Sequence, residues 1–168
     1  GRGGSKGLPL SAFLRCHGVV SVLPHEEYRQ NMSTRRVEFT LATEELLRKL
    51  YPAHPMGFMF HQSGGCCDGS APMCYEAGEF RVGPSDVLLG ELTVDGVEQP
   101  VKFYMSLEQF EVWAHTHLTI DVVPGRGSGF SMESPEGVRF LTRSRIFTDA
   151  EWLDLEPVYK GSGELLNS

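Results

Sequence analysis

The stretch DVLLGELTVDGVEQPVKFYM, residues 86–105, carries the clearest strand pattern in the chain. Leu88, Leu92 and Val94 fall on one face of an extended segment, with polar residues on the other face. Asp95-Gly96 is a typical turn sequence, and apolar residues alternate again over residues 101–105. The stretch therefore predicts an antiparallel hairpin with one buried face.

Similar patterns extend in both directions from this hairpin. Strands are predicted over residues 36–41, 57–61, 117–123 and 138–147, and residues 130–132 are predicted to be the return strand of a second hairpin. Helix starts are predicted at Thr43 and at two capping boxes, Ser106 with Gln109 and Thr148 with Glu151. The expected fold class is α+β, with a mainly antiparallel sheet and two or three short helices.

The length of 168 residues fits one domain. We assign the globular domain to residues 32–159. Residues 1–31 open with GRGGS and lack a clear strand or helix spacing, so they are interpreted as an N-terminal extension or an expression remnant. Residues 160–168 are predicted to be a flexible tail.

Composition excludes several classes of partner. Fifteen basic and 22 acidic residues give a net charge of -7, which argues against a nucleic-acid partner. No apolar run approaches the roughly 20 residues of a membrane-spanning helix.

Four cysteines are few for a disulfide scaffold and favour a reducing, cytoplasmic compartment. Because small soluble proteins often self-associate symmetrically, a homodimer is the default expectation.

The segment HQSGGCCDGSAPMC, residues 61–74, is the first candidate site. Imidazole and thiolate are preferred ligands of zinc, and glycines let a chain fold tightly around an ion. The predicted ligands are His61, Cys66, Cys67 and Cys74, with zinc as the first candidate metal and iron or copper as alternatives. Such a metal would polarise a substrate carbonyl or activate water if the protein is an enzyme.

Two other interpretations use the same residues. In a thiol oxidoreductase, Cys66 or Cys67 would attack a disulfide or an electrophile, and Cys74 would resolve the adduct. In a purely structural interpretation, the cysteines are small buried residues and the glycines form turns. Reactivity of the thiols in metal-free protein distinguishes these interpretations.

Histidines and acids elsewhere supply weaker candidates. His115 and His117 are spaced to place both rings on one strand face, either as further metal ligands or as part of a solvated polar face. Acidic residues downstream of the cysteines are candidates for a general base acting on a metal-bound water, although solvated surface acids are the commoner case. These acids are Glu76, Glu79, Asp86 and Glu91.

Four arginines are candidates for anion binding, namely Arg126, Arg139, Arg143 and Arg145. The last three alternate on one predicted strand, and the first lies in the glycine-rich turn GRGSG, residues 125–129. Guanidinium groups hold carboxylates and phosphates through paired hydrogen bonds. The alternative is that they form surface ion pairs within this acidic chain.

Several motifs together resemble a known family. They are HQSGGCCDGS at residues 61–70, PMC at 72–74, DVLLG at 86–90, DVVPGRG at 121–127 and PEGVRF at 135–140. Over Val37 to Trp152 the chain resembles the bacterial domain-of-unknown-function family 779. Members of that family are often encoded beside aldehyde dehydrogenases. The resemblance implies a small accessory protein of aldehyde or alcohol metabolism, with an aldehyde dehydrogenase as a partner, and it implies no reaction.

Overall fold

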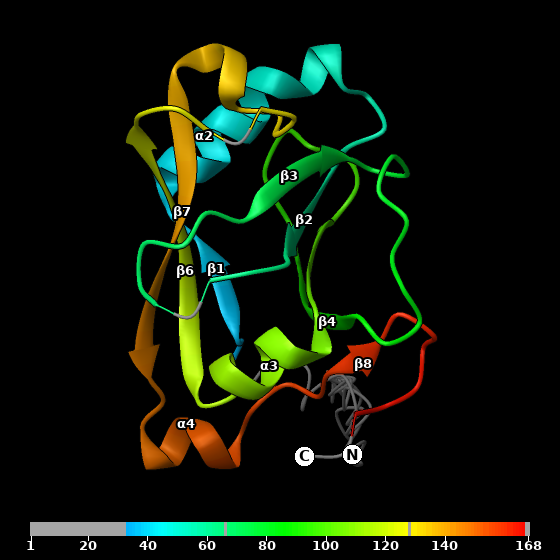
Figure 1. Ribbon diagram of the computed structural model, residues 1–168, viewed down its shortest axis with the longest axis vertical. Helices are drawn as coiled ribbons and strands as arrows, with labels where there is room; N and C mark the ends of the chain where they lie inside the picture. The colour runs from blue at the N-terminus through cyan, green and yellow to red at the C-terminus, as the bar shows by residue number, and fades with distance from the viewer. Residues whose placement is uncertain (1–32, 66, 128, 167–168) are drawn as a thin grey trace, which may run out of the picture.

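The computed structural model describes residues 33–65, 67–127 and 129–166, and it packs two β-sheets face to face (Figure 1). The three-stranded sheet has the order β1-β6-β7, with β1 (Val37–Phe39) parallel to β6 (Thr116–Pro124) and β6 antiparallel to β7 (Val138–Ile146). The predicted segment 1–31 lies outside the described residues. The α+β class is confirmed, with two sheets in place of the one expected.

The second sheet has five strands in the order β3-β2-β5-β4-β8. These strands are β2 (Phe58–Gln62), β3 (Met73–Glu76), β4 (Val87–Leu92), β5 (Val101–Met105) and β8 (Tyr159–Lys160). Strands β2 and β5 are parallel, and the other neighbouring pairs are antiparallel. Strand β3 therefore lies at one edge of this sheet, beside β2.

Helices connect the sheets at their ends. They are α2 (Leu41–Leu50), α3 (Leu107–Trp113) and α4 (Asp149–Leu153), with 3-10 turns η1 (Tyr51–Ala53) and η2 (Ser134–Glu136). Ser106 and Thr148 are helix caps, as their motifs predict. Helix α2 is capped by Thr40, because Thr43 turns inward and donates its hydroxyl to the Ile120 carbonyl at 2.8 Å. The predicted start at Thr43 was therefore three residues late.

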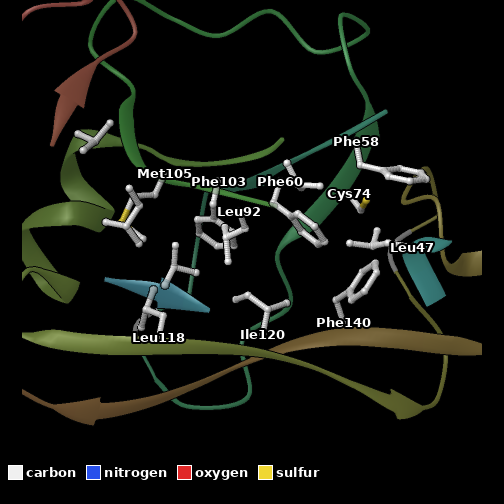
Figure 2. Close-up of a cluster of buried hydrophobic side chains, with 14 of the residues drawn as sticks. Leu47, Phe58, Phe60, Cys74, Leu92, Phe103, Met105, Leu118, Ile120 and Phe140 are labelled. Carbon is white, nitrogen blue, oxygen red and sulfur yellow. The ribbon is translucent and has the colours of Figure 1, made fainter. Parts of the chain in front are cut away.

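The core fills the space between the two sheets (Figure 2). Phe60 lies at its centre, with ring centroids 5.8 Å from Phe103 on the same sheet and 4.9 Å from Phe140 on the other. Leu118 and Ile120 approach from β6, and both are at most 1% exposed. Burial of such side chains contributes about 1.5–3 kcal/mol each, so this layer fixes which face of every strand points inward.

A β-bulge reverses the side-chain direction within strand β4, so the prediction that Leu88 and Leu92 share one face is wrong. Leu88 pairs with Tyr104 on the outer face of the sheet, whereas Leu92 pairs with Val101 on the core face. The register shifts between Leu88 and Gly90, so the two leucines point in opposite directions. Glycine suits position 90, because a Cβ added to Gly90 would lie only 3.1 Å from a methyl group of Val37.

Two further predictions differ from the structure. Residues 130–132 were predicted to be the return strand that pairs with β6, and this is wrong. The antiparallel partner of β6 is β7, while Phe130 is 90% exposed in a turn region. Residues 160–166, predicted as part of a flexible tail, make backbone contacts with the domain. Tyr159 pairs with Leu165, and the Leu166 N–H donates to the Val158 carbonyl at 2.9 Å. In the described part of the chain, no helix has the length and apolarity needed to cross a membrane.

Candidate functional site

Strands β2 and β3 separate two residues that the sequence suggests as common ligands. Cys74 pairs with Phe60 and His61 pairs with Met73. Neighbouring residues of a strand point to opposite faces. Cys74 therefore joins Phe60 in the core, as Figure 2 shows, while His61 points to the outer face of the sheet. The structure does not bring His61 and Cys74 together.

The Cys74 thiol is fully buried. Burial raises its pKa well above the ordinary value, and the nearby Glu133 carboxylate raises it further. The thiol is therefore protonated at neutral pH and is a poor metal ligand or nucleophile in this fold.

The loop between β2 and β3 is fastened to the edge of the other sheet. The Gly69 N–H donates to the Thr142 carbonyl, and the Thr142 N–H donates to the Ser70 carbonyl, both at 2.7 Å. The Ser144 N–H donates to Asp68 Oδ1 at 2.5 Å. These contacts place residues 68–70 beside β7, and Cys67, just before them, is exposed. Cys66 lies outside the described residues.

His61 is the buried polar group of the outer face. Its side chain is 4% exposed, and its ring packs on Phe80 with centroids 4.6 Å apart. Its Nδ1 lies 2.7 Å from the Ser63 hydroxyl oxygen. Its Nε2 has no hydrogen-bond partner, although Asp86 Oδ1 is only 3.3 Å away. A buried ring nitrogen without a partner is unusual and needs an explanation.

Asp86 is held in place by its own turn. Its Oδ2 accepts the Gly83 N–H at 2.7 Å, and its backbone carbonyl accepts the Gly161 N–H at 2.6 Å. Its Oδ1 is therefore the oxygen that faces His61. From the sequence, Asp86 is predicted only as one of several candidate general bases, because nothing in the spacing shows that residues 83–86 fold back over β2.

The other two candidate histidines lie on the three-stranded sheet. His115 is exposed and stacks on Trp152 at 4.9 Å, whereas His117 is buried against the edge of Phe147. His117 Nε2 lies 3.8 Å from Glu38 Oε2, and burial lowers the pKa of this histidine below its usual range. Since Leu118 faces the core, His117 faces away from it. Two sheets therefore separate these histidines from His61.

The candidate arginines do not converge on one point of the surface. Ion pairs join Arg143 to Asp121 at 2.9 Å and Arg145 to Glu151 at 2.8 Å. A further contact places Arg139 Nη1 3.5 Å from the Gly69 carbonyl, and Arg126 is exposed. Arg143 and Arg145 thus have the local carboxylate partners that the alternative interpretation expects, and anion binding by the set stays a prediction.

Glu133 is a buried acid that the sequence does not predict. It is 1% exposed, its Oε1 accepts the Phe140 N–H at 3.3 Å, and its Oε2 accepts the Ser131 hydroxyl. The Ser131 oxygen in turn accepts the Cys74 N–H at 2.9 Å. These bonds fasten strand β3 to the start of β7. A single glutamate in a turn sequence carries no signal of such burial.

Comparison with known proteins identifies one family. The family model for a domain of unknown function (DUF779) matches residues 46–146. The chain belongs to the DUF779 family. The matched DUF779 region runs from α2 to the end of β7, so it includes the loop cysteines, His61 and Asp86. No curated protein and no solved structure matches the chain.

No group of three histidine, cysteine, aspartate or glutamate side chains able to hold a metal occurs within residues 33–65, 67–127 and 129–166. Pairs of potential ligands do occur: His61 Nε2 lies 3.3 Å from Asp86 Oδ1, and His54 Nδ1 lies 3.3 Å from Glu76 Oε2.

Proposed function

We propose that this DUF779 protein binds a divalent transition metal, with zinc as the first candidate, through His61 Nε2 and Asp86 Oδ1. The observation that carries the proposal is the buried His61 Nε2, which lacks a hydrogen bond although a carboxylate oxygen lies 3.3 Å away. A metal ion shared by the two atoms would satisfy both of them.

The separation of the two atoms fits shared coordination. Zinc binds histidine nitrogen at about 2.0–2.1 Å and carboxylate oxygen at about 2.0–2.2 Å, in a tetrahedral arrangement. Two such bonds at the tetrahedral angle place the ligand atoms about 3.3–3.5 Å apart. The Nε2 and Oδ1 atoms are 3.3 Å apart, in an orientation that forms no hydrogen bond between them.

The surrounding contacts prepare both ligands. If the His61 Nδ1–H donates to the Ser63 oxygen, the lone pair of Nε2 is left available for a metal. The Gly83 N–H similarly occupies Asp86 Oδ2 and leaves Oδ1 available. The remaining coordination positions would accept water or substrate, and a metal bound in this way polarises a carbonyl or lowers the pKa of its water.

The proposed ligand set differs from the one expected from the sequence. His61 is retained, Asp86 is added, and Cys74 is removed because it lies in the core. The thiol oxidoreductase alternative loses support for the same reason, since a fully buried Cys74 is badly placed to resolve an adduct on exposed Cys67. Partnership with an aldehyde dehydrogenase stays a prediction, testable by co-elution of the two proteins.

The test is a zinc titration of chelator-treated protein by calorimetry, together with elemental analysis of protein purified without chelator. The variants are His61→Phe, which keeps a ring against Phe80, and Asp86→Asn, which keeps the shape of the side chain. The matched control is His117→Phe, because His117 is also a buried histidine beside a carboxylate. A Cys67→Ser variant tests the loop thiol separately.

We expect one zinc per chain in the parent, loss of binding in His61→Phe and Asp86→Asn, and unchanged binding in His117→Phe and Cys67→Ser. A folded parent that takes up no zinc in the titration would refute the proposal. Loss of zinc in Cys67→Ser, with retention in Asp86→Asn, would instead assign the metal to the loop thiols.

A further inference from the structure

A pocket of about 470 Å³ opens on the outer face of the five-stranded sheet. Strands β2 and β5 form its floor, and the segment after β3 forms its wall. Its lining includes Met59, Phe80, Val82, Lys102 and Tyr104. The volume lies within the range of about 300–1,000 Å³ that is typical of small-molecule sites. We infer that this pocket binds a small, neutral, mostly apolar molecule that carries one hydrogen-bond-accepting oxygen.

The shape and apolar lining suit a compact hydrocarbon body. Met59 is 6% exposed on the floor, and Phe80 stands over the outer face, stacked on Tyr75 with centroids 4.8 Å apart. Val82 and Phe58 add further apolar surface. A ligand that covers this surface removes it from water, which contributes about 25 cal/mol per Å².

The charges around the pocket favour a neutral ligand. Lys102 is the only charged residue among those lining the pocket in the described chain, and its Nζ lies 3.5 Å from Glu91 Oε1. An anionic ligand would compete with Glu91, and a cationic ligand would lie beside Lys102 without a carboxylate lining the pocket to receive it. Desolvating an unpaired charge is costly in either case.

The polar contact is assigned to Tyr104. Within the described residues its hydroxyl has no hydrogen-bond partner, and Tyr104 is half-buried on the β5 part of the pocket floor. The other neutral polar side chain of the lining, Gln99, already accepts from the Tyr51 hydroxyl at 3.2 Å and donates to the Pro55 carbonyl at 3.4 Å. Among the neutral side chains of the lining, the phenol O–H is therefore the available donor for a ligand oxygen.

The pocket adjoins the candidate metal site through one side chain. Phe80 lines the pocket and also packs on the His61 ring at 4.6 Å, and the same segment continues to Asp86. If the proposed metal site is correct, a ligand that moves Phe80 also changes zinc affinity, and zinc changes ligand affinity by the same factor. This coupling alone rests on the proposed function.

The experiment titrates 2-naphthol into chelator-treated protein and follows the naphthol fluorescence. 2-Naphthalenesulfonate provides an anionic probe of similar shape. Val82→Trp fills the pocket, and Tyr104→Phe removes only the hydroxyl. Val112→Trp is the matched control, since Val112 is an exposed valine on α3 outside the pocket. Circular dichroism checks that each variant is folded.

We expect saturable binding of one 2-naphthol per chain, at least about tenfold weaker binding of the sulfonate, and no binding to Val82→Trp. Tyr104→Phe should weaken binding about two- to tenfold, and Val112→Trp should leave it unchanged. Absence of saturable binding to the folded parent, or equal binding to the two tryptophan variants, would overturn the pocket assignment. Equal or tighter binding of the sulfonate would overturn the neutral class.

Because the titration uses metal-free protein, its failure is separate from a failure of zinc binding. If Val82→Trp does not fold, Tyr104→Phe still tests the assigned contact. Repeating the naphthol titration with saturating zinc tests the coupling, and an unchanged dissociation constant for naphthol would refute that step alone.

Discussion

Replacing Glu133 with leucine is expected to destabilise the protein strongly, although it removes a buried charge. Glu133 is 1% exposed and accepts hydrogen bonds from the Ser131 hydroxyl and the Phe140 N–H. Replacing a buried charge together with its partners is often neutral or stabilising. Here both donors stay in the folded protein, at 3% and 0% exposure, and lose their acceptor.

The magnitude follows from the two lost bonds. A hydrogen bond to a charged group contributes about 1.5–3 kcal/mol. The Phe140 bond is long at 3.3 Å and belongs at the low end of that range. The apolar side chain gains some burial energy, so the net loss for Glu133→Leu is about 3 kcal/mol. For a chain of this length that loss lowers the melting temperature by about 6–12 °C.

Glu133→Gln should be far milder, at about 1 kcal/mol. The amide oxygen can accept the Phe140 N–H, and the amide N–H can donate to the Ser131 oxygen. Glu111→Leu on the exposed face of α3 is the control and should change stability by no more than about 0.5 kcal/mol.

The assay is urea unfolding followed by circular dichroism and tryptophan fluorescence, with melting temperatures by calorimetry. A Glu133→Leu variant as stable as the parent would show that the two donors find other partners or that the buried carboxylate is not needed. Equal losses for the leucine and glutamine variants would show that charge, and not donor satisfaction, is the important property.

Three further outcomes are expected. Burial lowers the pKa of His117, so the unfolded chain, with a histidine pKa of about 6.5, binds the proton more tightly than the folded chain does. The stability of the protein should therefore fall as the pH drops below that value. His117→Phe should reduce this fall, as measured by the midpoints of urea unfolding from pH 7.5 to 5.5. An unchanged slope would contradict this cause. Gly161→Ala should weaken zinc binding, because the new Cβ would lie 2.2 Å from the Gly83 carbonyl oxygen and must shift the turn that holds Asp86. An unaltered zinc affinity in calorimetry would argue against Asp86 as a zinc ligand. Arg145→Leu should raise the pKa of Glu151 from about 2 toward its ordinary value, since the hydrogen bonds from Arg145 are the main cause of the lowered pKa. An NMR titration of the carboxyl carbon shift measures this pKa, and an unchanged pKa in the variant would contradict that cause.

Local chemistry made much of the fold predictable. The caps at Ser106 and Thr148 depend on a side chain and a backbone N–H three residues away, so the sequence contains the whole interaction. Strand β2 and the long strands β6 and β7 follow from their alternating or continuous apolar residues. The family assignment likewise follows from contiguous motifs.

The candidate site was only half predictable. His61 is conspicuous beside the cysteines, but its neighbour Asp86 lies 25 positions further along the chain and is brought near by a loop that crosses the sheet. Cys74 seemed to belong with His61 by proximity in sequence. The strand alternation places it on the other face, and burial raises its pKa.

By itself, the sequence determined the properties that arise within a few residues: the caps, the apolar periods of the strands, the acidic net charge and the motifs of the family. Only the tertiary structure decided which faces meet across the two sheets, where the bulge in β4 reverses the side-chain direction, and which carboxylates accompany His61 and Ser131. The physical reason is that pairing register and burial arise from contacts between distant segments, and these contacts set the direction of each side chain and the charge state of buried groups such as the Cys74 thiol.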